Sequence, residues 1–251
     1  MNLNNLRGLV LPVLLLGAWE YASRQGAAGA YAFVPLAQVG SALSELLGSG
    51  ELLVNLWASL LRTCTGLAIG IVTGLALGTL MALSAPANRL IAPLFHALRQ
   101  VPMLGWIPLI ALWLGNGEGA KLLIVSLAAL YPVALNTFES LRQVEGQHRE
   151  AARVLMLSPW QQLRLILLPA ALPGIATGVL QALAFAWVTS VGSELFLSSG
   201  AGLGSLMMNA EAAARMEIIV VCVLCIGLCG YLMSWLCSRL ARRLLRWRPT
   251  P

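Results

Sequence analysis

The sequence predicts an all-α protein, a polytopic membrane bundle of about six transmembrane helices with a helical loop on the cytoplasmic side. Of its 251 residues, 59% are hydrophobic and only 10% are charged, whereas soluble domains carry about 25% charged residues. Apolar runs long enough to cross a bilayer recur along the chain. A basic tail, about residues 237–251, follows the last run, which is typical of a cytoplasmic flank. We therefore expect residues 1–251 to form a single transmembrane domain.

Six segments are candidate spans, since a helix needs about 20 residues to cross the hydrocarbon core and satisfies its own backbone there. They run from about Leu9 to Ala22, Leu60 to Leu83, Leu90 to Leu114, Ala120 to Phe138, Ala170 to Val191 and Ile218 to Leu236. The third segment contains Arg99, Gln100 and Pro102. Because proline removes a backbone donor, we expect a broken helix there.

The first segment has a second interpretation. A short basic start, an apolar run and the small residues of 26–30 also resemble a cleavable signal peptide. Trp19, Glu20 and Tyr21 at the end of the run favour an interfacial anchor instead. Cleavage would leave the topology of the later spans unchanged.

Lysine and arginine predict the orientation. With the N-terminus inside, eleven of these residues fall in cytoplasmic segments, and three, Arg24, Lys121 and Arg215, fall in outer segments. Basic residues concentrate on the cytoplasmic side of membrane proteins. Both termini are therefore expected in the cytoplasm of a bacterium, with the chain crossing the inner membrane several times and contacting its lipid.

Glycine recurs at every fourth position of the second span, at Gly66, Gly70, Gly74 and Gly78. Small residues let helix backbones approach closely, which matters where lipid gives no hydrophobic drive for association. We expect this face to pack against another helix.

The longest cytoplasmic loop, about residues 139–168, has helical character. Its first part opens a short helical stretch, and Ser158 and Gln161 then form a capping-box pattern around Pro159. Two short helices joined by a tight corner are predicted. The residues of this corner are Glu150, Ala151, Ala152, Leu155, Met156, Leu157, Ser158 and, at the entry to the fifth span, Pro169. Such a corner either lies in a groove of a soluble partner or rests on lipid headgroups.

A resemblance separates these two options. Glu150-Ala151-Ala152, followed by Leu168-Pro169, resembles the EAA loop of permease subunits from binding-protein-dependent ATP-binding-cassette (ABC) importers. The resemblance implies a coupling helix that docks on the ATPase and transmits its closure. Met156 stands where that motif usually has glycine, and methionine resists the left-handed backbone that glycine permits.

The resemblance also implies an assembly. Two cytoplasmic ABC ATPase subunits, a second copy of this chain and one extracytoplasmic substrate-binding protein are expected as partners. ATP and magnesium would be bound by the ATPase, and this chain would hold no cofactor.

Further stretches narrow the resemblance to one branch of the family. They are Val101 to Leu109, Leu112 to Gly115, Asn136-Thr137, Ser193-Glu194 and Gly202 to Asn209. Together they resemble the branch that imports aliphatic sulfonates, taurine and nitrate, and close relatives import pyrimidine precursors of thiamine. The implied function is ATP-driven import of a small anion, with an aliphatic sulfonate or taurine expected first.

The candidate pathway residues are Arg99, Pro102, Trp106 and Asn136. A cation within a span is costly unless it faces water, protein or an anionic solute, so Arg99 is expected at the pathway or its mouth. Snorkelling to the inner interface is the alternative.

Polar groups near the outer side are expected to serve local structure and docking. Glu194, at the end of the fifth span, is expected to hydrogen-bond locally or to cap the outer segment Leu203 to Met216. That segment, with the loop from Arg24 to Leu56, is the expected dock for the binding protein.

Other function classes lack their signatures. No Gly-x-x-x-x-Gly-Lys-Ser/Thr loop is present, so this chain is not expected to be an enzyme. His96 and His148 are isolated, and Cys222 and Cys225 have no second pair, which gives no metal site. Basic residues are not interleaved with aromatics across the interior, which argues against nucleic acid. A proton-coupled secondary transporter remains a more distant alternative, and it would need an acidic residue deep in a span.

Overall fold

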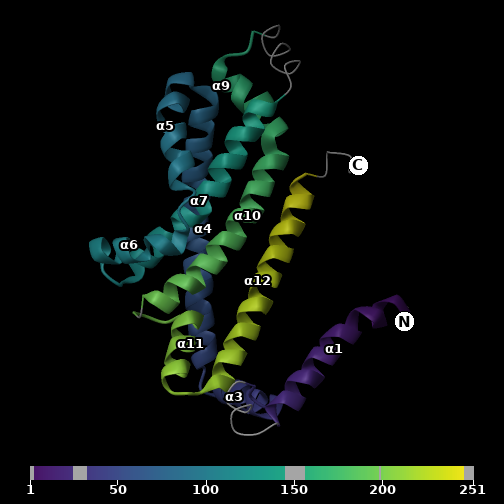
Figure 1. Cartoon of the computed structure of the whole chain (residues 1–251). Helices are drawn as coiled ribbons and strands as arrows, with labels where there is room; N and C mark the ends of the chain where they lie inside the picture. The colour runs from purple at the N-terminus through teal and green to yellow at the C-terminus, as the bar shows by residue number, and fades with distance from the viewer. Residues whose placement is uncertain (1–2, 25–32, 145–155, 198, 246–251) are drawn as a thin grey trace.

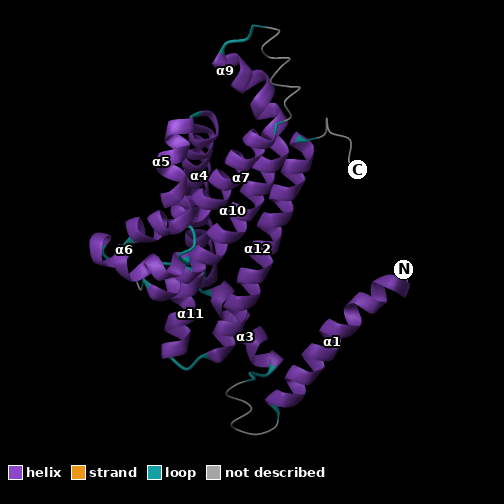
Figure 2. Ribbon diagram, turned by 45° about the horizontal axis from the view of Figure 1, so that its top comes forward, coloured by secondary structure: helices purple, strands orange, loops and turns teal. Residues whose placement is uncertain are grey.

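A computed structural model describes residues 3–24, 33–144, 156–197 and 199–245. Every regular element in these ranges is helical, which confirms the all-α prediction (Figure 2). The helices are α1 (Leu3–Ser23), α3 (Leu36–Gly48), α4 (Glu51–Leu83), α5 (Ala85–Leu98), a 3-10 turn η1 (Met103–Trp106), α6 (Ile107–Leu114), α7 (Glu118–Gln143), α9 (Pro159–Gln162), a π-helical stretch (Leu163–Leu167), α10 (Leu168–Phe196), α11 (Leu203–Ala212) and α12 (Met216–Leu244).

Fewer helices than predicted are long and apolar enough to cross a membrane. Within the described residues these are α4, α7, the continuous helix Pro159–Phe196 and α12, with the bent pair α5 and η1–α6 as a fifth. The described residues therefore contain four or five of the about six spans that the sequence predicts. α1 is helical over 21 residues and is not among them.

The third predicted span is broken, as expected, and the break is sharp. α5 ends at Leu98, and η1 and α6 continue at an angle of 92° to it. Figure 1 shows α5 lying along α4 and α6 projecting sideways from the bundle at mid-height. Pro102 has an extended backbone, with ψ 134°, and begins the new direction, because a residue without a backbone N–H cannot continue the helix ladder.

α7 is the central helix and lies between α4 and α10 (Figure 1). All four glycines of α4 face it: a Cβ added at Gly70 would lie 2.4 Å from the Cβ of Ala129, and one at Gly78 would lie 2.4 Å from the carbonyl oxygen of Ala134. α10 makes the same kind of contact through Gly178, whose added Cβ would lie 2.7 Å from the Cβ of Asn136. The glycines therefore set the spacing of the three helices.

A buried charge cluster also joins α4, α7 and α10. Arg62 of α4 donates from Nε and Nη2 to the Glu118 carboxylate of α7, at 2.9 and 2.8 Å, and from Nη1 to Glu194 of α10. The side chain of Arg62 is 3% exposed and that of Glu194 is fully buried. Lys121 is also fully buried and donates to the carbonyl oxygen of Ser199. Lys121 lies near the start of α7, three residues after Glu118, and its assignment to an outer segment stays a prediction.

The same cluster fixes the chain that links α10 to α11. The backbone N–H groups of Gly202, Leu203 and Gly204 donate to Asn55, Ser59 and Glu194, at 2.8, 2.9 and 2.8 Å. The expected cap on the outer segment is thus present, since Glu194 accepts from the first turn of α11. Its pairing with Arg62, 132 residues away in sequence, was not predicted.

Different helices lie at the two ends of the bundle. Figure 1 places α9 and the C-terminal end of α12 at one end and α3 and α11 at the other. At the second end, Arg215 donates to both carboxylate oxygens of Glu45 on α3, at 2.9 and 2.7 Å, which lowers the pKa of Glu45. α1 diverges from the other helices and joins α3 through Trp19, whose Nε1 donates to the carbonyl oxygen of Val34 at 2.8 Å.

Replacing Gly70 with alanine tests the spacing role. The added methyl group would overlap Ala129 and the carbonyl oxygen of Ser126, so we expect a loss of roughly 1–3 kcal/mol in unfolding free energy. The matched control is Gly227→Ala in α12, where an added Cβ meets nothing within 4 Å and the better helix propensity of alanine is free to act. Denaturant titration of the purified protein in micelles measures both, and equal stabilities would contradict the role.

Replacing Glu194 with glutamine tests the buried cluster. Removing one partner leaves the Arg62 guanidinium buried with less compensation, and such a loss costs about 3 kcal/mol or more. Glu45→Gln, which breaks the exposed pair with Arg215, is the control and should change stability much less. Thermal unfolding of both variants in the same detergent would rank them, and the reverse order would show that the cluster contributes little.

Candidate translocation pocket and cytoplasmic corner

A pocket of about 430 Å³ lies where the broken helix meets α7 and α10. It is lined by Arg99, Val101, Pro102, Met103, Leu104, Ala128, Tyr131, Pro132, Leu135, Gln181, Phe185 and Thr189. Three segments far apart in sequence therefore share it. Two of the four predicted pathway residues, Arg99 and Pro102, are among the lining residues.

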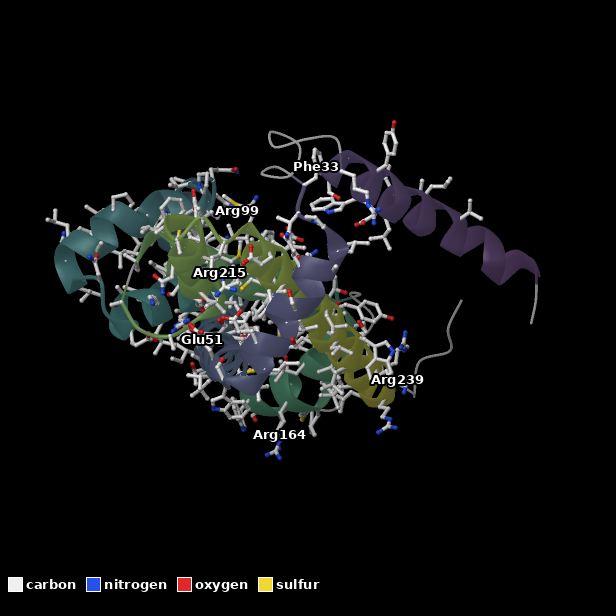
Figure 3. All side chains as sticks on the ribbon, turned by 90° about the horizontal axis from the view of Figure 1, so that it is seen from below. Phe33, Glu51, Arg99, Arg164, Arg215 and Arg239 are labelled. Carbon is white, nitrogen blue, oxygen red and sulfur yellow. The ribbon has the colours of Figure 1, made fainter. Side chains whose placement is uncertain are left out.

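Arg99 is the C-terminal cap of α5 and is exposed. Within the residues that the structure describes, its guanidinium forms no hydrogen bond or ion pair, although it carries up to five N–H donors. Arg62, by contrast, is enclosed by two carboxylates. In Figure 3, Arg99 lies on a different side of the bundle from Arg164 and Arg239. Only Arg99 of these arginines faces the pocket with its charge uncompensated.

Asn136 reaches the pocket through a neighbour. Its Nδ2 donates to the carbonyl oxygen of Pro132, at 2.8 Å, and to Oε1 of Gln181, at 3.1 Å. Gln181 lines the pocket, and Asn136 does not. The close approach at Gly178 brings the two helices near enough for this bond.

Trp106 lies away from the lining. It packs in a cluster with Ile107, Ile110 and Ile124, and its indole N–H is buried without a hydrogen-bond partner among the described residues. The structure therefore does not bring Trp106 together with the other three predicted pathway residues.

The cytoplasmic corner is described from Met156 onward. The capping box is present: Ser158 Oγ accepts from the Gln161 N–H at 3.4 Å, and the Ser158 N–H donates to Gln161 Oε1 at 2.8 Å. The carbonyl oxygen of Leu157 accepts from Gln162 at 2.9 Å. Four of the predicted corner residues, Glu150, Ala151, Ala152 and Leu155, lie outside the described residues.

Met156 adopts the backbone that it was expected to resist. Its φ is 50°, and its side chain is 92% exposed. A left-handed conformation costs a non-glycine residue roughly 1–2 kcal/mol. A left-handed backbone is therefore present at this position without a glycine, and methionine carries the strain.

The second predicted short helix is not a separate element. α9, the π-helical stretch and α10 form one helix from Pro159 to Phe196, and Pro169 lies in its first α10 turn, where a proline is tolerated. Leu163 and Leu167 are buried against Leu141 and Ile175. The corner is thus continuous with the helix that lines the pocket.

Sequence reasoning missed Gln181, Phe185 and Thr189. Gln181 is a polar residue inside an otherwise apolar span, and a polar residue in a span is a functional candidate by default. That signal was available for Gln181. No such signal marks Phe185, because an aromatic residue in a span is ordinary.

Comparison with known proteins identifies the family. A family model described as "Binding-protein-dependent transport system inner membrane component" matches residues 66–246. The family consists of non-catalytic membrane subunits of ABC transporters, whose ATPase is a separate subunit. The match includes the pocket, the corner and α12.

Individual relatives agree. A protein described as an aliphatic sulfonates transport permease, SsuC, of Bacillus subtilis is 33% identical over 97% of this chain and 88% of its own length. Its namesake from Escherichia coli is 36% identical, over 95% and 90%. Relatives at 31% identity are named for taurine, nitrate and bicarbonate.

A solved structure has the same fold. The MetNI methionine ABC transporter, in an inward-facing form, superposes with a TM-score of 0.62 at 22% identity, over 75% of this chain and 94% of its own. The chain belongs to the binding-protein-dependent transport system inner membrane components and is an ABC importer permease subunit.

Proposed function

We propose that this permease translocates a small organic anion, an aliphatic sulfonate or taurine, across the bacterial inner membrane with both termini in the cytoplasm. The observation that carries the anion proposal is the uncompensated Arg99 in a pocket whose lining includes no carboxylate. Relatives named for aliphatic sulfonates support the choice of solute.

Other solutes and another mechanism compete. Nitrate, bicarbonate and a pyrimidine precursor of thiamine would suit the same importer class. A proton-coupled secondary carrier would need an acidic residue able to exchange protons within the bilayer. The buried Glu194 is bound by Arg62, Ser59 and a backbone N–H, which suits a structural role better than a proton relay.

The proposed mechanism links ATP to the pocket through one rigid element. Two copies of this chain would pair, as closed two-fold symmetry favours, and the corner of each would dock on an ATPase subunit that binds ATP and magnesium. The helix Pro159–Phe196 runs from that corner to the pocket lining. Closure of the ATPase would move this helix and shift the permease between inward-open and outward-open states, with a binding protein delivering solute outside.

Replacing Arg99 with methionine tests the anion pathway. We expect sulfonate uptake by the reconstituted importer to fall about tenfold or more, because a charge-assisted contact is lost. Arg89→Met, on the same helix and also exposed, is the control and should retain uptake. Unchanged uptake of every anion by the Arg99 variant would remove the proposal.

Replacing Glu150 with lysine tests the coupling corner. A charge reversal in the docking motif is expected to abolish co-purification with the ATPase subunit, while the permease still folds. Glu139→Lys, on an exposed position near the end of α7, controls for added charge at this end of the molecule. If the Glu150 variant still co-purifies with the ATPase subunit, the corner is not the site at which the ATPase docks.

A further inference from the structure

The pocket contains an unusual imbalance of hydrogen-bonding groups. Besides Arg99, its lining offers the hydroxyl groups of Tyr131 and Thr189 and the amide of Gln181. Within the described part of the chain, none of these donors is used by a protein acceptor. Thr189 is buried and Tyr131 half-buried, whereas Arg99 and Gln181 are exposed. These donors are therefore available to a ligand that supplies several acceptor oxygens.

Asn136 decides which end of the Gln181 amide is available. Its Nδ2 donates to Oε1 of Gln181 at 3.1 Å. An amide offers one acceptor oxygen and two N–H donors, so this bond occupies the oxygen and leaves the N–H groups free. Asn136 is therefore a positioning residue that presents Gln181 as a donor.

The rest of the lining is apolar. Phe185 on α10 is 57% exposed, and Val101, Met103, Leu104 and Leu135 line the same pocket. The pocket thus combines a cationic, donor-rich part with an aromatic and aliphatic part. A ligand that matches both has an anionic head and a hydrocarbon tail.

Size and charge separate the candidate anions. A four-atom anion such as nitrate is little larger than one water molecule, which takes about 30 Å³ of liquid volume, and would fill a small part of 430 Å³. Taurine carries an ammonium group, but the lining has no carboxylate to receive it. An alkanesulfonate has three acceptor oxygens and an apolar tail.

Resting on the proposed function, we propose that the permease itself selects alkanesulfonates over taurine and inorganic anions. Arg99 and the Asn136-held Gln181 contact the sulfonate, and Phe185 contacts the alkyl chain. The permease would then add its own selection to that of the binding protein.

Binding to the purified permease–ATPase complex in lipid nanodiscs, without binding protein, tests this inference. Equilibrium dialysis with radiolabelled ethanesulfonate, butanesulfonate and hexanesulfonate gives affinity against chain length, with taurine and nitrate as competitors. We expect affinity to rise about two- to fourfold for each methylene group and taurine and nitrate to compete weakly.

Variants of the lining residues separate the contribution of the alkyl tail to binding from that of the sulfonate head. Phe185→Ser should flatten the dependence on chain length, whereas Phe196→Ser, at an exposed phenylalanine of the same helix outside the pocket, should leave it unchanged. Gln181→Leu and Asn136→Leu should lower affinity roughly fivefold at every chain length and keep the slope. A purely structural role for Asn136 would not lower the affinity equally at every chain length and leave the dependence on chain length unchanged.

The opposite results overturn the inference. They are a flat chain-length series in the unmodified complex, no sulfonate binding at all, equal competition by taurine, or an unchanged slope in the Phe185 variant. The proposed function has its own test, which is sulfonate uptake by the complete importer with its binding protein, so a permease without selectivity can be distinguished from an importer that carries no sulfonate.

Discussion

The distance between α7 and its two neighbours is the constraint on which the structure depends. In lipid, helices gain no hydrophobic energy by associating, so close van der Waals contact has to hold them together. α4 meets α7 through four glycines, and α10 meets it through Gly174 and Gly178. At a larger spacing, Arg62 would not reach Glu194 and Asn136 would not reach Gln181. Small residues thus determine the polar contacts, although they take no part in them.

The two arginines within the bundle illustrate how environment assigns roles. Arg62 is surrounded by two carboxylates and a carbonyl oxygen, and its charge is neutralised inside the protein. It therefore ties α4, α7, α10 and the chain before α11 into one unit. Arg99 has the same chemistry but lies at a helix end beside an open pocket whose lining has no carboxylate, which is why we propose it as a contact for the solute. The carboxylates within reach thus distinguish the structural arginine from the proposed functional one.

Local patterns in the sequence predicted local structure well. The glycine face, the break near Pro102 and the capping box at Ser158 follow from geometry within a few residues. The pairing of Arg62 with Glu194 and the joint lining of the pocket by Arg99 and Gln181 require knowledge of which helices are neighbours, and single-sequence periodicity does not contain it. The sequence does not predict the continuity of Pro159–Phe196, because a proline such as Pro169 is typical of a helix boundary. In the structure this proline is accepted where the preceding turn widens into a π-helical stretch.

The bend of 92° between α5 and α6 has a consequence for the peptide groups around it. Helix ends leave backbone carbonyl and N–H groups without intrahelical partners, and hydrocarbon offers them none. Here both ends lie partway through the bundle, next to the pocket. The break meets part of this need itself, because the N–H groups of Gln100, Val101 and Gly105 donate to carbonyl oxygens three residues earlier. A helix can therefore change direction at this depth with a few tight turns, and its remaining peptide groups need partners from the protein or from the pocket.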